Sequence, residues 1–301
     1  MTPPVAGPPR LLPGLLLAIT GAITFSGKAI IVKLAYRYGV DAVTLIMLRM
    51  LFALPIFAAM AGWASRGKAP LSARDWLGVT GLGFCGYYLS SFLDFLGLQS
   101  ISASLERLIL YLNPTFVMLL AWLLYRRKFA RLQLAGMALS YCGVVLVFGH
   151  EVRLAGQQTA IGAALILGSA VTYALYLVYS GELVKRLGAL RLVGLATSIA
   201  CLFCIAQYAL LRPIGGALDV APQVLWLSVL NATLCTAVPV LLVMMAIERI
   251  GPALSAQSGM VGPLATIMMG VWILGEPFTA WIAAGTVLVI AGIFVFSRAA
   301  R

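Results

Sequence analysis

Five charged residues interrupt long apolar stretches of this sequence: Lys28, Arg49, Asp94, Glu106 and Arg107. A charge at membrane depth is costly, so it usually faces a partner of opposite charge or a functional site. If successive apolar stretches cross a membrane in opposite directions, all five residues reach a similar depth. We therefore expect one charge cluster, in which three positive and two negative groups largely neutralise each other.

The sequence leaves the role of this charge cluster open between three hypotheses. The first is a gate, whose ion pairs form when a cavity faces the cytoplasm and separate when it faces outward. The second is a binding site, in which Lys28 or Arg49 holds the carboxylate of a substrate. The third is a static network that only joins helix ends. Lys28 has one more alternative, because a long side chain near a helix end can extend to the lipid headgroups.

Polar and aromatic side chains also occur near the middle of six apolar stretches. Unpaired polar groups are costly there, so they must face one another, water or a ligand. Tyrosines mixed with amides and hydroxyls are typical of a cavity for a small solute that is partly apolar and partly polar. We expect such a central cavity to be lined by Thr24, Tyr87, Tyr88, Ser91, Tyr111, Asn113, Tyr173, Tyr176, Asn231 and Gln257.

The elements that must position these groups follow from the composition. Hydrophobic residues make up 62% and charged residues 10% of the 301 residues, whereas a soluble domain has roughly 25% charged residues. Apolar stretches of about 20 residues can cross a hydrocarbon core as helices. We expect an all-α integral membrane protein with ten transmembrane helices, at 11–33, 41–62, 76–98, 103–125, 131–149, 160–181, 191–211, 223–246, 253–274 and 279–297.

Lysine and arginine predict the orientation, because they concentrate on the cytoplasmic side of a membrane. With the N-terminus inside, fourteen of them fall in cytoplasmic segments and four on the opposite side. Both termini are therefore expected in the cytoplasm. The basic run from Arg126 to Lys128 then contacts anionic lipid and is not a nucleic-acid patch, despite the net charge of +12.

An internal repeat links residues 102–148 with residues 251–297 at an offset of 149 residues. The matched positions include Pro114 and Pro263, which each remove one helix hydrogen bond, so we expect helix breaks there. Five helices in each half is an odd number, so the second half must enter the membrane inverted, as in secondary transporters. The expected division is a tail at 1–10, a first repeat at 11–149, a connecting loop at 150–159, a second repeat at 160–297 and a tail at 298–301.

A pair of glycines seven residues apart lies on the last helix of each half, Gly136 with Gly143 and Gly285 with Gly292. Each pair forms a small stripe on one helix face, where two backbones can approach closely. We expect these two helices to pack against each other, either within one chain or between two chains. A monomer and a dimer joined through these helices are both compatible with this pattern.

Other kinds of chemistry lack the residues that they need. Cys201 and Cys204 have a metal-binding or redox spacing, but they lie in an apolar helix without a partner cluster, so we expect packing and no metal. His150 is the only histidine and lies at a membrane boundary, so we expect no special role; proton coupling would fall to Asp94 or Glu106. No zinc-protease or nucleophile motif is present, so we expect neither an enzyme nor a bound cofactor.

Two stretches resemble the drug/metabolite transporter superfamily, and within it the EamA-type members. These stretches are Ser102 to Ile109 followed by Asn113-Pro114, and Pro252 to Ser255 followed by Pro263 and Leu274-Gly-Glu276-Pro277. The first half departs from the pattern with Tyr125-Arg-Arg127, so no acidic role passes to Arg127. The chain is also similar to the YddG-like exporters, which implies efflux of aromatic and other neutral amino acids through a central cavity.

We therefore expect a multi-pass secondary transporter of the bacterial inner membrane that works by alternating access. Its expected partners are an amino-acid substrate and the lipid bilayer, with no nucleic acid. The alternatives are a carrier of nucleosides or sugar conjugates, a membrane-embedded lipid-modifying enzyme, and a channel. The enzyme would need acidic residues and histidines clustered at one membrane face, and the channel would need a repeat related by rotation about the membrane normal.

Overall fold

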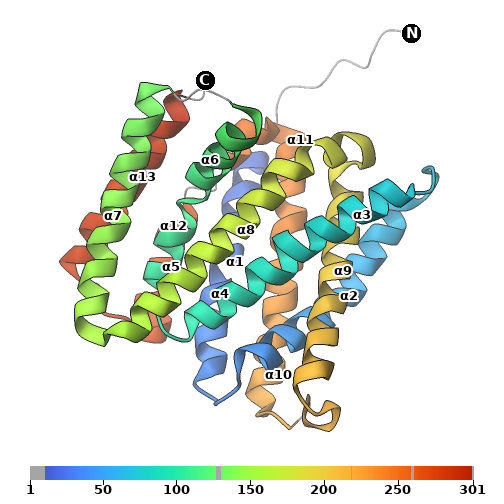
Figure 1. The fold of residues 1–301 in the computed structure, drawn as a ribbon, viewed down its shortest axis with the longest axis horizontal. Coiled ribbons are helices and arrows are strands. Elements are labelled where there is room, and N and C mark those ends of the chain that lie inside the picture. The colour runs from blue at the N-terminus through green and yellow to red at the C-terminus, as the bar shows by residue number, and fades with distance from the viewer. Residues whose placement is uncertain (1–10, 127–129, 218, 259–260, 300–301) are drawn as a thin grey trace.

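The computed structural model describes residues 11–126, 130–217, 219–258 and 261–299, and every regular element in these ranges is helical (Figure 1). The α-helices are α1 (Leu11–Tyr36), α2 (Ala42–Ser65), α3 (Ala73–Leu82), α4 (Ser90–Leu98), α5 (Ala103–Leu110), α6 (Asn113–Tyr125), α7 (Arg131–Ala155), α8 (Gln157–Leu187), α9 (Ala189–Leu211), α10 (Pro222–Ala232), α11 (Val238–Ser258), α12 (Gly262–Met269) and α13 (Ala280–Ala299). Three π-helical segments, η1 (Gly83–Leu89), η3 (Thr233–Ala237) and η5 (Gly270–Leu274), extend α3, α10 and α12, and η2 (Ile214–Ala217) is a 3-10 turn.

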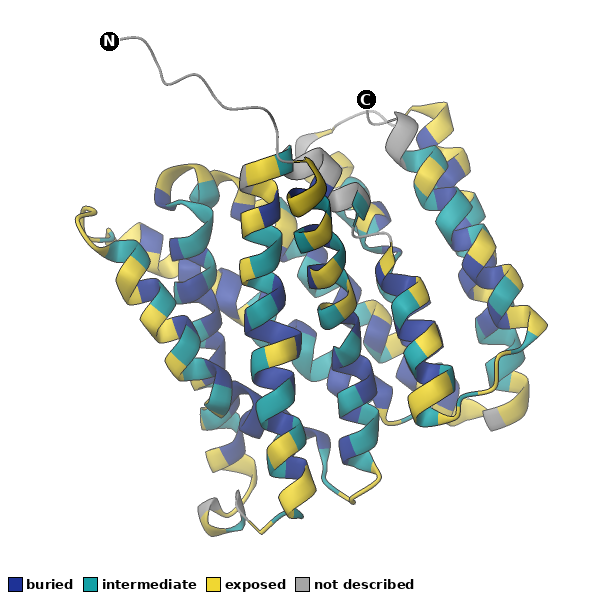
Figure 2. Cartoon of the chain, turned by 180° about the vertical axis from the view of Figure 1, so that it is seen from behind, coloured by how far each residue is buried: buried dark blue, intermediate teal, exposed yellow. Residues whose placement is uncertain are grey.

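The helices are apolar on the outside as well as between one another. Within the described ranges, seven helical runs are long and apolar enough to cross a membrane, and two shorter apolar runs follow at 262–274 and 280–296. Large side chains such as Leu77, Leu154 and Leu210 are 76%, 73% and 85% exposed. Figure 2 shows the buried residues gathered where the helices face each other. Apolar outer faces are what lipid requires, so the predicted all-α fold and its membrane character are confirmed.

Two expected boundaries are wrong. The segment 150–159 was expected to be a loop, but α7 continues to Ala155 and α8 begins at Gln157. Gly156 alone reverses the chain, because its φ of 71° is a conformation that glycine adopts without steric cost. In addition, α11 continues to Ser258, although we expected separate helices at 223–246 and 253–274. The helix therefore continues through Pro252, although a proline in a helix interior removes one hydrogen bond.

Two other prolines lie in the first turn of a helix. After α5 ends at Leu110, α6 begins at Asn113 with Pro114 in its first turn. Pro263 lies in the first turn of α12 in the same way. The helical runs 73–98 and 222–258 remain continuous but widen into η1 and η3, and these two π-helical segments coincide under the 149-residue offset. Such wide turns redirect side chains and are frequent at functional sites.

The glycine stripes of α7 and α13 face each other within one chain. Figure 1 shows the two helices side by side at one edge of the bundle. A Cβ atom on Gly136 would lie 2.6 Å from the carbonyl oxygen of Gly292, and a Cβ on Gly143 would lie 2.6 Å from that of Gly285. The predicted packing of these helices is therefore confirmed in its within-chain form, with the two helices antiparallel.

The remaining helices pair in a regular way around the interior. The helix α1 packs along α11, α2 packs along α9, and α8 packs along α4 and η1. The start of α1 and the end of α13 lie at the same end of the bundle, which we call the N-terminal end (Figure 1). The turn between α1 and α2 lies at the opposite end, which we call the distal end.

Asp41 shows how the distal end is held together. Its carboxylate caps α2 by accepting hydrogen bonds from the backbone of Val43 and Thr44, and it lies 3.5 Å from the guanidinium of Arg212 after α9. Partial burial would raise the pKa of this carboxyl, but the hydrogen bonds from Thr44 and Val43 and the charge of Arg212 outweigh burial and lower it. Asp41 therefore stays ionised and joins α2 to the end of α9.

The crossing of α7 and α13 gives a stability prediction. In Gly136→Ala, the new methyl group would meet backbone atoms of Gly292 and Phe296 at 2.6 and 2.7 Å, and backbone cannot easily move away. We expect a loss of about 1–3 kcal/mol, measured as a lower melting temperature of the purified protein in detergent.

Gly149→Ala is the matched control on the same helix. A Cβ atom at Gly149 meets nothing within 4 Å, so this variant should be neutral or more stable by up to about 1 kcal/mol. Equal melting temperatures for Gly136→Ala and the wild type would contradict the close packing.

Candidate functional site

A cavity of about 500 Å³ lies between α1, η1, α5, α8, α11 and α12. Its volume is within the range of pockets that hold small metabolites. Most of its wall is apolar, with Phe25 of α1 and Val243, Met244 and Ile247 of α11. The residues that α1 contributes run from Ala18 to Ser26, so the cavity occupies the N-terminal side of the bundle interior.

Three tyrosines form one side of the cavity, and we call them the tyrosine wall: Tyr87, Tyr173 and Tyr176. The rings of Tyr87 and Tyr176 meet edge to face with centroids 5.1 Å apart, and their hydroxyls are 3.2 Å apart. Tyr173 stacks on Tyr176 at 5.5 Å. Gly86 makes room for this arrangement, because a Cβ atom there would lie 2.4 Å from the Tyr176 ring. The wall offers aromatic faces with few free hydroxyl groups.

Another part of the cavity wall joins α1, α5 and α12 through polar contacts. The Ser26 hydroxyl donates to the carbonyl oxygen of Gly262 at 2.8 Å. Arg107 donates from Nε to the hydroxyl of Thr266 at 2.9 Å, and its guanidinium carbon lies 5.7 Å from the ring centroid of Phe25. Arg107 is the one charged residue in the described part of the cavity wall.

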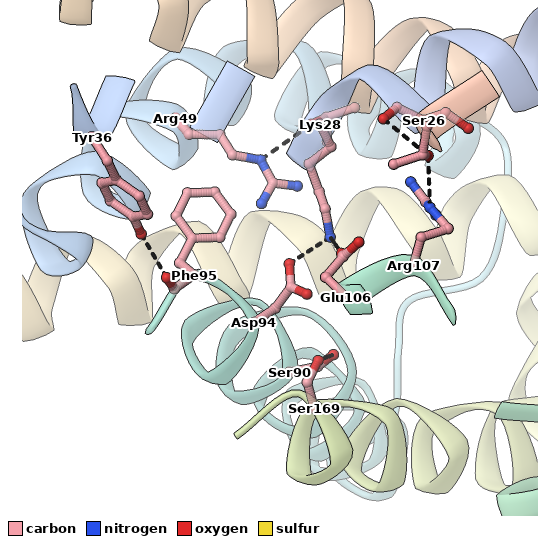
Figure 3. Close-up of polar contacts among 12 residues, drawn as sticks. Ser26, Lys28, Tyr36, Arg49, Ser90, Asp94, Phe95, Glu106, Arg107 and Ser169 are labelled. Atoms are coloured by element: carbon pink, nitrogen blue, oxygen red, sulfur yellow. Dashed lines mark hydrogen bonds and ion pairs between the residues drawn. The ribbon is translucent and has the colours of Figure 1, made fainter. Parts of the chain in front are cut away.

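The acidic part of the charge cluster lies next to this cavity on its distal side. The Lys28 ammonium is 2.6 Å from a carboxylate oxygen of Asp94 and 3.7 Å from one of Glu106 (Figure 3). These three residues are 8%, 1% and 0% exposed. The alternative that Lys28 extends to the headgroups is therefore wrong for this conformation, because pairing with two buried carboxylates holds its side chain inward.

Arg49 reaches the same region from α2. Its Nε donates to the Thr236 hydroxyl of η3 at 3.2 Å, and its guanidinium carbon lies 5.3 Å from the centroid of the Phe95 ring, beside Asp94 in α4. The five predicted residues of the charge cluster thus gather where α1, α2, α4 and α5 converge. Ion pairs link Lys28 with Asp94 and Glu106, whereas Arg49 and Arg107 contact hydroxyls and rings.

The structure brings four of the predicted cavity residues into the wall: Tyr87, Tyr111, Tyr173 and Tyr176. Thr24 instead donates its hydroxyl to the carbonyl of Thr20 in its own helix at 2.9 Å. Tyr88 packs against Phe84, Phe92 and Phe203 on another side of the helix. Ser91, Asn113 and Asn231 also lie away from the cavity wall, and Gln257 lies outside the residues whose side chains the structure describes.

Some wall residues were not expected from the sequence, among them Phe25, Ser26 and Ser180. Arg107 was expected in the charge cluster but not in the cavity. A signal for its position was present, because Arg107 and Tyr111 are four residues apart and share a helix face. Ser180 likewise follows Tyr173 and Tyr176 at helical spacing on α8.

The distal end is closed by a separate set of contacts. Glu276 accepts hydrogen bonds from the backbone nitrogens of Ala103 at 2.7 Å and Ser104 at 3.3 Å, so its charge neutralises the N-terminus of α5. Ser102 donates its hydroxyl to Glu151, and Lys33 donates to the carbonyl of Ile101 at 2.7 Å. A second pocket of about 590 Å³ lies among these groups. His150 lines it and stacks on Trp281, with ring centroids 5.7 Å apart.

No group of three histidine, cysteine or acidic side chains among the described residues is arranged to hold a metal ion. Cys201 and Cys204 are buried in the core, where the Cys201 sulfur lies 3.7 Å from that of Met50. These two cysteines therefore contribute packing.

Comparisons with known proteins agree with this architecture. The chain matches the EamA-like transporter family twice, over residues 12–149 and 160–298. It is 30% identical to the uncharacterized transporter YcbK of Bacillus subtilis, over 87% of this chain and 86% of that protein. It is 25% identical to an uncharacterized transporter of Archaeoglobus fulgidus, over 93% of this chain and 96% of that protein. A solved crystal structure aligns with a TM-score of 0.59 at 19% identity, over 97% of this chain and 99% of the other, which shows a shared fold.

A bundle of apolar helices around a central cavity, matched over its length to transporters, defines a multi-pass membrane transport protein and not an enzyme. The chain belongs to the EamA-like transporter family, within the drug/metabolite transporter superfamily.

The buried ion pairs give a second stability prediction. Lys28→Met would leave Asp94 and Glu106 buried without their cation, which typically costs about 3–5 kcal/mol. We expect a clearly lower melting temperature in detergent. The double variant Lys28→Met/Asp94→Asn should recover part of this loss, because one of the two uncompensated charges is gone. A double variant that is less stable than Lys28→Met would contradict the pairing.

Proposed function

We propose that this protein is a secondary transporter that exports aromatic and other neutral amino acids by alternating access. The observation that carries this proposal is the position of the cavity relative to the charge cluster. The cavity lies on the N-terminal side, and the buried ion pairs of Lys28 lie on its distal side. A carrier needs this arrangement in one of its two states, with a solute pocket open to one side and closed to the other.

We further propose ten transmembrane helices in two inverted repeats, 11–149 and 160–297. The double family match supports two repeats. The antiparallel crossing of α7 and α13 supports their inversion. Gly136 contacts Gly292, and Gly143 contacts Gly285. The 149-residue offset instead matches Gly136 with Gly285 and Gly143 with Gly292, so the contacts join glycines that are not matched by the repeat. A twofold axis between the two helices and perpendicular to them produces this exchange. Because these glycines are used within the chain, we propose that the transporter is a monomer.

We propose that both termini face the cytoplasm of a bacterial cell, with the distal end outside. The excess of lysine and arginine on the N-terminal side supports this orientation. The conformation described here is then the inward-facing one. The ion pairs of Lys28 and the contacts of Glu276 would form the external gate.

The tyrosine wall supports aromatic and other neutral amino acids as substrates, as in the YddG-like exporters. Tyrosine rings accept apolar and aromatic bodies by face and edge contacts. The same wall could accept a nucleobase, so a carrier of nucleosides is the alternative.

Counterflow in liposomes tests the substrate class. Purified protein in liposomes preloaded with unlabelled phenylalanine should accumulate labelled phenylalanine and threonine, and unlabelled tryptophan should abolish this uptake. Uridine and a labelled sugar serve as controls and should not accumulate. Movement of uridine alone would overturn the amino-acid proposal while leaving a carrier in place.

The same assay tests whether the charge cluster is a gate. Asp94→Asn removes the negative charge that pairs with Lys28 and keeps a side chain of nearly the same size at position 94. If the ion pairs form and separate during transport, this variant loses counterflow at a normal expression level. Unchanged transport by Asp94→Asn would favour the static network.

Surface labelling tests the orientation. Tyr38 lies in the turn between α1 and α2, and Ala69 lies in the connection between α2 and α3; both are exposed. In a background without the five native cysteines, Tyr38→Cys should react with an impermeant maleimide in cells whose outer membrane alone is permeable. Ala69→Cys should react only after the inner membrane is opened. Labelling of both residues from one side would contradict the proposed topology.

A further inference from the structure

Arg107 combines three properties that no other residue of the described cavity wall shares. It is charged, it is only 4% exposed, and its Nη2 nitrogen is buried without a hydrogen-bond partner among the described residues. A buried donor without a partner is costly, and the cost is larger for a charged group. The rest of its guanidinium is fixed, because Nε donates to Thr266 and the group lies over Phe25. Nη2 is therefore held in place and makes no hydrogen bond to the described residues.

Arg107 makes no ion pair within 4 Å among the described residues, whereas Lys28 makes two. Lys28 lies 2.6 Å from Asp94 and 3.7 Å from Glu106, so the closest contacts of both carboxylates to a cation are with Lys28. Three positive and two negative buried side chains leave one excess positive charge in a medium where an uncompensated charge is unfavourable. An anion beside Arg107 would remove that excess.

Arg49 is the other arginine of the charge cluster and provides the comparison. It is 6% exposed and has an unpartnered Nη1 among the described residues, but it does not line the cavity. Its guanidinium lies over Phe95, on the side where helices pack together. A solute in the cavity can therefore reach the excess charge at Arg107 and not at Arg49.

The rest of the cavity accepts an apolar body and offers no acid to a cation. Its described wall contains the tyrosine wall, aliphatic side chains and hydroxyls, and no aspartate or glutamate. An arginine at one side of an apolar pocket is the typical arrangement for a carboxylate at one end of an aromatic or aliphatic molecule.

We propose that Arg107 binds the carboxylate of the transported solute, whose apolar body lies against the tyrosine wall. The solute class is then a carboxylate with an aromatic or aliphatic body, in which the carboxylate is required and an amino group is dispensable. This inference rests on the proposed function for its site. It replaces the expectation that Lys28 or Arg49 holds the carboxylate, because Lys28 is paired and Arg49 lies outside the cavity.

Ligand-induced stabilisation tests the inference without requiring transport, because a ligand that binds only the folded protein raises its melting temperature. The probes are phenylalanine, 3-phenylpropionate and phenethylamine at equal concentration and neutral pH. Phenylalanine and 3-phenylpropionate carry the carboxylate and should stabilise the purified protein. Phenethylamine keeps the ring and the amine but lacks the carboxylate, so it should have no effect. Equal stabilisation by phenethylamine, or stabilisation by none of the three, would overturn the proposal.

Variants assign the effect to Arg107. Arg107→Gln should weaken carboxylate binding about 10- to 100-fold, as expected for the loss of a charged hydrogen bond, and should abolish the preference over phenethylamine. Arg107→Lys should restore part of that preference. Arg49→Gln removes the same charge from the same cluster and should keep the preference. If Arg107→Gln retains the wild-type preference, or Arg49→Gln loses it equally, Arg107 is not the carboxylate site.

The two proposals fail in different ways. A wild-type protein that is stabilised by 3-phenylpropionate but moves no solute in liposomes would contradict transport and support the site at Arg107. A protein that moves phenylalanine but is stabilised equally by phenethylamine would support transport and contradict the carboxylate site at Arg107. If Arg107→Gln does not fold, the ligand preference of the wild type decides alone.

Discussion

The ion pairs of Lys28 with Asp94 and Glu106 are the contact around which the interior is arranged. In a hydrocarbon environment an isolated charge is unstable, so the helices that carry these residues must meet at one depth. The convergence of α1, α4 and α5 brings the three side chains together and removes them almost completely from solvent. This convergence closes the space between the helices on the distal side. The space that remains on the N-terminal side is the cavity.

Small residues and irregular backbone determine the shape of that cavity. Gly86 admits the ring of Tyr176, and Gly262 lies beside Ser26 and Tyr111, where a larger residue would fill the space. The π-helical η1 carries Tyr87 and directs it toward α8. Away from the cavity, the close crossing of α7 and α13 holds the two family-matched segments together. The two segments also meet along α1 and α11 and along α2 and α9, so the cavity itself lies between them.

The two matched segments contribute different chemistry to the site. All five residues of the charge cluster come from the first segment. The second segment contributes hydroxyl groups to two of them, Thr236 to Arg49 and Thr266 to Arg107. Two of the three residues of the tyrosine wall, Tyr173 and Tyr176, also lie on the second segment.

The sequence by itself determined the membrane environment, the helical fold, the depth of the five charges and the close packing of the two glycine-bearing helices, but not whether that packing lies within one chain. These follow from composition, hydrophobic length and helical spacing, which are properties of single helices. Local backbone was less predictable, since Gly156 replaced a loop with a single turn and Pro252 did not end α11. Only the tertiary structure decided which polar residues share a cavity. Depth along a helix can be counted from the sequence, but the direction in which each side chain points depends on how that helix is rotated against its neighbours. Because of that rotation, Tyr87 lines the cavity whereas Tyr88 packs against Phe203. The Thr24 hydroxyl donates to a carbonyl of its own helix. Arg107 lies in the cavity wall and Arg49 does not.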